Sequence, residues 1–223
     1  MRARTDGRHA MPQSDTGLRA TLARHRSTAF LVAGLMFVID AAIVGYSTTT
    51  AGEELLLLGQ AFVAAGWTAG FIGLLGIYPD LADRRRRLAR VGLACVVVGI
   101  VVFVAMGVAS VAFYTGLVRG ELSALVPLLL PGVIVGSVLG FVVFGATTLR
   151  TGAHARPVGV LFVVLGLFPV VNIGSGIAGV QSMTVTLAIV VGLALVNLAV
   201  SYLLRDDGAA GRVEPDSARE PTA

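Results

Sequence analysis

The sequence predicts an all-α polytopic membrane protein, folded as a bundle of six transmembrane helices. Apolar residues make up 56% of the 223 residues, and the mean hydropathy is +0.86, whereas soluble domains are about 45–50% apolar. Charged residues make up only 13%, and they lie between long uncharged stretches. Because a single soluble core of this length could not bury so much apolar surface, hydrocarbon is the expected solvent for most of the chain.

Six apolar stretches are long enough to cross a bilayer, which requires about 20 residues. They cover residues 28–47, 54–78, 88–115, 124–148, 157–178 and 183–204. We expect each stretch to be a helix, because a helix satisfies its backbone hydrogen bonds within one segment in lipid. Uninterrupted runs of this length exclude β-barrel strands, which alternate over about 9–11 residues.

The ends of the chain are polar. Residues 1–27 form an arginine-rich tail, which is either a short helix lying on anionic lipid or a disordered segment near the membrane. Residues 205–223 have mixed charge and no apolar periodicity, so we expect a disordered tail there. Within the fifth stretch, Pro169 precedes Gly174 and Gly176. This pattern indicates either a broken helix that lines a cavity or an ordinary helix end.

The distribution of arginine predicts the orientation. All 17 basic residues are arginines, and all but Arg119 lie in the two tails or in the second and fourth connectors. Basic residues are retained on the cytoplasmic face. The protein is therefore expected in the cell membrane with both termini in the cytoplasm. The connector arginines Arg84, Arg85, Arg86, Arg87 and Arg90 act either as topology determinants or as ligands of anionic lipid headgroups.

Composition excludes several kinds of chemistry. The absence of lysine rules out Schiff-base catalysis and a P-loop. One cysteine cannot form an intramolecular disulfide, and no histidine is placed to bind haem inside the bilayer. We therefore expect no cofactor, no metal site and no catalytic residues. The net charge of +4 does not indicate a nucleic-acid partner, because the arginines flank membrane spans.

Asp40 is the most informative polar position, because it interrupts an apolar span. At about 1.5 Å per residue it lies roughly 18 Å from the cytoplasmic end, near the bilayer midplane. No arginine lies deep within a span, so a buried ion pair is not expected. Residues at a similar depth in other spans are Gln60 and Asn172, with Tyr114 nearer the outer end. These four side chains could line a polar cavity in the outer half of the membrane.

Two roles for Asp40 remain open at this point. In the first, the carboxyl is neutral, hydrogen-bonded to one amide, and fixes the packing of the helices. In the second, it is the protonation switch of a proton-coupled transporter. Both roles place the side chain toward the interior of the bundle.

Glycines recur at intervals of four in two spans: Gly66 and Gly70 in the second, and Gly132, Gly136 and Gly140 in the fourth. Glycines four apart share one helix face and let backbones approach closely in lipid. We expect these faces to pack within the bundle. A homo-oligomer seam and a pore lining are the alternatives.

The Ala/Val/Gly-rich helices, the exclusive use of arginine and the connector YPDLADRRRRLARVG resemble small uncharacterised multipass membrane proteins of high-GC bacteria or halophilic archaea. The resemblance covers the membrane region, contains no specific motif and implies no activity or functional residue. The sequence therefore favours a non-catalytic packing or assembly subunit, with the bilayer and either a second copy or a membrane-complex partner as its partners. The alternative is a small-solute or proton-coupled transporter or channel that uses Asp40.

Overall fold

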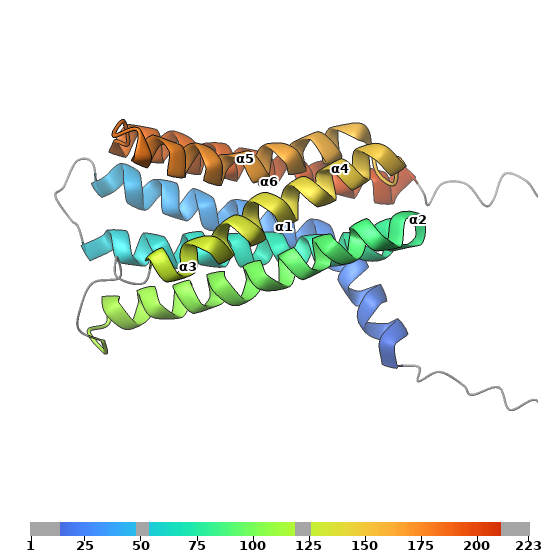
Figure 1. Cartoon of the computed structure of the whole chain (residues 1–223), viewed down its shortest axis with the longest axis horizontal. Helices are drawn as coiled ribbons and strands as arrows, with labels where there is room; N and C mark the ends of the chain where they lie inside the picture. Colours follow the sequence, from blue (N-terminus) through green and yellow to red (C-terminus); the bar gives the residue numbers. More distant parts are fainter. Residues whose placement is uncertain (1–13, 48–53, 119–125, 211–223) are drawn as a thin grey trace, which may run out of the picture.

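A computed structural model describes residues 14–47, 54–118 and 126–210, which form helices arranged as one bundle (Figure 1). No strand occurs among these residues. The elements are α1 (Ser14–Ser47), α2 (Glu54–Tyr114), α3 (Val126–Val133), the π-helix η2 (Ile134–Gly140), α4 (Phe141–Thr151), α5 (Arg156–Ile177) and α6 (Met183–Ala210). The predicted all-α class is confirmed for this part of the chain.

Five helical segments of the described chain are long and apolar enough to cross a membrane: Ala23–Ser47, Leu55–Tyr114, Pro127–Thr151, Arg156–Ile177 and Met183–Asp206. The sequence predicts six spans, because it treats residues 54–78 and residues 88–115 as two separate helices. In the structure, the connector between these two stretches is itself helical except at Arg85, whose φ of −146° and ψ of 71° interrupt the helix. Both stretches therefore belong to α2.

Helix α2 folds back on itself at Arg85, so it consists of a first leg (residues 54–84) and a second leg (residues 86–114) (Figure 1). Side chains at comparable distances from Arg85 meet across the two legs. The rings of Phe71 and Phe103 lie 5.8 Å apart, and a Cβ on Gly107 would lie 3.2 Å from the Cβ of Ala64. The two legs therefore pack antiparallel.

The fourth apolar stretch crosses the second leg of α2 through η2. This π-helix was not expected, because the sequence predicts one continuous helix over residues 124–148. At the crossing, a Cβ added to Gly136 would overlap the Cα of Gly99. The two backbones are therefore in direct contact, in the manner of small-residue helix packing in membranes. π-helical turns are rare and often mark functional or strained positions.

An aromatic cluster fills the centre of the bundle. Trp67 lies at its middle, with ring centroids 5.6 Å from those of Phe103 and Phe141 and 5.8 Å from that of Phe37. The outer surface is also apolar, as shown by Val101, Val108 and Leu195, each more than 60% exposed. A large apolar exterior around an aromatic core suits a protein that is surrounded by lipid.

The helix ends differ from the expected boundaries at both termini. Helix α1 begins at Ser14, so the second half of the expected N-terminal tail is helical. Helix α6 continues to Ala210 instead of ending at residue 204. The rest of the two expected tails, residues 1–13 and 211–223, lies outside the described residues. Helix α5 runs through Pro169 and ends at Ile177, followed by Gly179 with φ +67°, so this end of α5 is an ordinary helix terminus.

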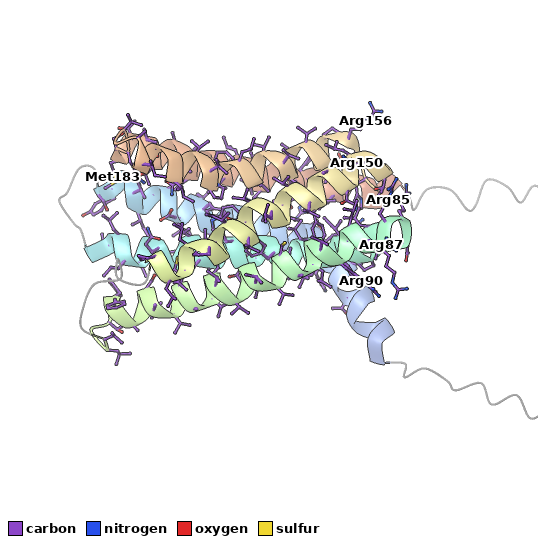
Figure 2. All side chains as sticks on the ribbon, in the orientation of Figure 1. Arg85, Arg87, Arg90, Arg150, Arg156 and Met183 are labelled. Carbon is purple, nitrogen blue, oxygen red and sulfur yellow. The ribbon has the colours of Figure 1, made fainter. Side chains whose placement is uncertain are left out.

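The two ends of the bundle differ in charge. Figure 2 shows Arg85, Arg87, Arg90, Arg150 and Arg156 gathered at one end, whereas Met183 lies at the other. We call these the arginine end and the Met183 end. The position of a residue along the bundle can therefore be stated relative to these two ends.

Candidate functional site

A cavity of about 560 Å³ lies in the Met183 half of the bundle. All six apolar stretches contribute to its walls, which are mostly aliphatic and aromatic. Its polar lining residues are Asp40, Gln60, Asn172, Gln181 and Thr186. A concave, largely apolar space of this size with a few converging polar groups is typical of small-molecule sites, which occupy about 300–1,000 Å³.

Asp40 lines this cavity and is only 3% exposed. Gly59 of the first leg of α2 provides the space for the carboxyl, because a Cβ at Gly59 would lie 2.7 Å from Asp40 Oδ1. Within the described segments of the chain, the carboxyl forms no hydrogen bond or ion pair. An unpaired ionised carboxyl at this depth costs about 2.5–3.5 kcal/mol on insertion scales. The group is therefore suited to bind a proton or a ligand.

Gln60 and Asn172 line the same cavity as Asp40. Gln60 follows Gly59 directly and is exposed. The Asn172 side-chain oxygen accepts a hydrogen bond from Gln181 Nε2 at 3.3 Å, which links the end of α5 to the segment before α6. Three of the four residues of the predicted polar site are thus brought together.

Tyr114 does not belong with them. Its side chain is 43% exposed, and it is absent from the cavity walls. It lies near the correct end of the bundle but on an outward-facing side of the second leg of α2. The depth of a residue in its span predicts the position of its side chain along the bundle axis. It does not predict the direction in which the side chain points around the helix axis.

Sequence reasoning missed two polar residues of the cavity, Gln181 and Thr186. Thr186 Oγ1 donates a hydrogen bond to the carbonyl of Ser182 at 3.2 Å. Both residues lie at or just before the start of α6, and polar residues are common at the ends of membrane spans. Their depth in the membrane could have identified them, because the chain reverses direction after Asn172 and passes the same depth again.

Aromatic rings close the cavity on the side toward the arginine end. Trp67 and Phe103 are lining residues, and their rings stack at a centroid distance of 5.6 Å. Behind them, the rings of Phe71 and Phe141 lie 5.5 Å apart, and both side chains are fully buried. The cavity therefore ends near the middle of the bundle, against a layer of packed rings.

An ionic cluster joins three elements at the arginine end. Arg26 Nη1 of α1 donates to Asp80 Oδ2 of α2 at 2.5 Å, and His154 Nε2, from the connector between α4 and α5, lies 3.3 Å from the same oxygen. Nearby, Arg84 Nη1 donates to the carbonyl of Thr151 at 2.6 Å. The close approach of His154 and then the hydrogen bond from Arg26 hold the pKa of Asp80 below its ordinary value, although partial burial acts in the opposite direction.

The pKa of Asp80 leads to a testable pH dependence. A carboxyl with a lowered folded-state pKa stabilises the fold above its unfolded-state pKa, and this contribution is lost as the pH falls through the folded-state pKa. Thermal unfolding in mild detergent should therefore show acid destabilisation of the wild type below about pH 4. Asp80→Asn should lower stability at pH 7 by about 1 kcal/mol, a modest value because the side chain is 42% exposed, and should flatten the acid response.

Asp83→Asn is the matched control for this measurement. It makes the same chemical change at an exposed neighbouring position, so it should leave both the stability and its pH dependence close to those of the wild type. Identical curves for the two variants would show that the ionic cluster contributes nothing specific.

The connector arginines are all exposed. A second concavity, of about 740 Å³, lies among them, and three of the five, Arg84, Arg86 and Arg90, line it together with Tyr78 and Asp83. Arg85 and Arg87 do not line it. The structure therefore separates the predicted arginine group into two sets.

The glycines that the sequence singles out face the chain's own helices. A Cβ on Gly66 would lie 3.0 Å from the ring of Phe37, and one on Gly70 would lie 3.4 Å from the ring of Phe141. Along the fourth stretch, the Cβ of a substituted Gly132 would overlap Val102, whereas that of Gly140 would lie 3.6 Å from Val96, an ordinary contact. These faces are occupied by side chains and backbone of the same molecule.

Within residues 14–47, 54–118 and 126–210, no group of three or more His, Cys, Asp or Glu residues could hold a metal ion. The chain matches no protein-family model, no curated protein and no solved structure.

Proposed function

We propose that this protein binds a small solute in the Met183-half cavity and moves it across the membrane. One observation carries the proposal: polar side chains from separate helices converge on a single cavity of about 560 Å³ inside a bundle whose exterior is apolar. Polar groups in a membrane are costly when they only fill space, so their convergence favours a ligand site.

The proposal includes a membrane arrangement. The two legs of α2 cross the membrane separately, which gives six crossings, and the arginine end lies in the cytoplasm together with both termini. The five arginines labelled in Figure 2 support this orientation because they gather at one end, and basic residues are retained on the cytoplasmic side. They also lie where they would meet anionic lipid headgroups. The cavity then lies in the outer half of the bilayer.

A transporter of this kind must open its two ends in turn. The aromatic layer of Trp67, Phe103 and Phe141 separates the cavity from the arginine end. The ionic cluster of Arg26, Asp80 and His154 holds α1, α2 and the α4–α5 connector together beyond that layer. For release into the cytoplasm, the rings must separate and the cluster must break, so these contacts form the inner gate.

The assembly role favoured by the sequence has less support. A homo-oligomer seam requires free glycine faces, yet Gly66, Gly70 and Gly136 contact Phe37, Phe141 and Gly99 of the same chain. We therefore assign the glycine faces to packing within the bundle. An assembly role would require another surface.

A substitution that narrows the cavity tests the proposed function. Thr186→Trp places an indole among the lining residues, so it should occupy part of the cavity and strongly weaken solute binding. The purified protein is screened in detergent against amines, amides, carboxylates and neutral aromatic compounds for an increase in its thermal unfolding temperature, because a ligand that binds only the folded state stabilises it. A solute that stabilises the wild type is then tested for uptake into proteoliposomes that contain the protein. We expect uptake at least tenfold above that of Thr186→Trp.

Thr184→Trp is the matched control, because Thr184 is exposed and is not part of the cavity wall. It should behave as the wild type in both assays. Equal uptake by wild type and Thr186→Trp, with both proteins folded, would contradict the proposed function. A complete absence of stabilising solutes would also contradict it.

A further inference from the structure

The charge of the cavity is unbalanced. Asp40 is the only charged or titratable side chain among the described residues that line it, and these residues include no arginine or histidine. The arginines labelled in Figure 2 lie at the opposite end of the bundle. Among the described residues, the single carboxyl therefore has no positive partner in the cavity, whose inner side is closed by packed rings. An occupant that carries one positive charge would supply that partner.

The walls indicate what kind of cation fits. Three aromatic side chains, Trp67, Phe103 and Phe168, line the cavity, and aromatic faces attract cations. Most of the remaining wall is aliphatic. A small hydrated metal ion would gain little from such walls, and the described residues hold no cluster of metal ligands. The cavity is better suited to an organic cation with a bulky apolar body.

The neutral polar residues of the cavity wall also favour a cationic ligand. Gln60, Asn172 and Gln181 bring amide groups to the wall, and their carbonyl oxygens can accept hydrogen bonds from an amine or attract its positive charge. An anion would face the Asp40 carboxyl, and no cationic side chain among the described lining residues would offset that charge. A neutral solute would leave the carboxyl unpaired.

We infer that the cavity selects lipophilic organic monocations, with the Asp40 carboxylate as their counter-ion. The inference rests on the proposed solute-binding function and narrows it to one substrate class. Gly59 is the positioning element, because the absence of its side chain leaves room for the carboxyl in the cavity wall.

Two probe ions of nearly identical shape and opposite charge test this inference: tetraphenylphosphonium and tetraphenylborate. Trp67 is the only tryptophan of the chain and lines the cavity, so its fluorescence reports occupancy of this site directly. In titrations of the purified full-length protein, the phosphonium ion should change the Trp67 emission saturably. Tetraphenylborate should produce no saturable change at the same concentrations.

Variants identify the counter-ion. Asp40→Asn should weaken phosphonium binding at least tenfold, whereas Asp40→Glu should bind within a few fold of the wild type. Asp206→Asn removes the same charge at an exposed position on α6 and should bind normally. Since Asp40→Asn could also disturb folding, the double variant Asp40→Asn/Asn172→Asp moves the carboxyl to another wall of the same cavity and should regain most of the lost affinity.

The failure of this inference can be distinguished from the failure of the proposed function. Equal binding of both ions, or unchanged phosphonium binding by folded Asp40→Asn, would overturn the cation assignment. If Thr186→Trp still abolished phosphonium binding, measured for this variant by equilibrium dialysis because it contains a second tryptophan, the cavity would remain a solute site without charge selection. No saturable response to either ion in the wild type would also overturn the cation assignment, and the solute screen would then decide the proposed function alone.

Discussion

Gly136→Leu is expected to prevent the bundle from forming. Even a single Cβ at Gly136 would overlap the Cα of Gly99, and the obstacle is backbone, which cannot rotate aside as a side chain can. The smaller change Gly136→Ala should destabilise the protein by about 1–3 kcal/mol, the usual cost of overpacking a core. Thermal unfolding in mild detergent and size-exclusion chromatography measure both effects.

The same glycine face provides a matched control. A Cβ at Gly140 would lie 3.6 Å from Val96, an ordinary van der Waals contact, so Gly140→Ala should be close to neutral. Gly174 has open space around it, and Gly174→Ala should also be tolerated. Equal losses of stability at Gly136 and Gly140 would show that the backbone crossing is not the element that holds the fourth stretch in place.

The helical class and the positions of the apolar helices could be predicted from composition and run length. The fifth stretch illustrates the precision: residues 157–178 were expected, and α5 covers Arg156–Ile177. Hydrocarbon imposes this regularity, because every backbone group must be satisfied within its own helix. Polar segments have no such constraint. The segment after Tyr78 was expected as a connector between two separate spans, whereas it is helical on both sides of Arg85.

The π-helix Ile134–Gly140 had no sequence signal. Its residues are as apolar as their neighbours, and its geometry arises at a crossing with Gly99 that only the three-dimensional packing specifies. The candidate site was also predictable only in part. Depth along a span placed Gln60 and Asn172 with Asp40, because helix rise is constant. Rotation about the helix axis was not predictable, and Tyr114 therefore faces outward.

Gln181 and Thr186 were missed for a related reason. Polar residues at a span end are inexpensive whether or not they line a cavity, so type and position alone do not identify them. Their role depends on the fold, which brings the start of α6 against the end of α5 through the Asn172–Gln181 hydrogen bond.

The sidedness of the cavity tests the central claim most directly, and the expected effect is all-or-none. In a Cys95→Ala background, which removes the single native thiol, Gln60→Cys places a thiol on the cavity wall and Arg86→Cys places one at the arginine end. A membrane-impermeant maleimide should label Gln60→Cys and not Arg86→Cys in intact cells, and the pattern should reverse in inverted vesicles. Labelling of Arg86→Cys in intact cells, or of Gln60→Cys only from the cytoplasmic side, would contradict an outer cavity in a membrane bundle with its arginines inside.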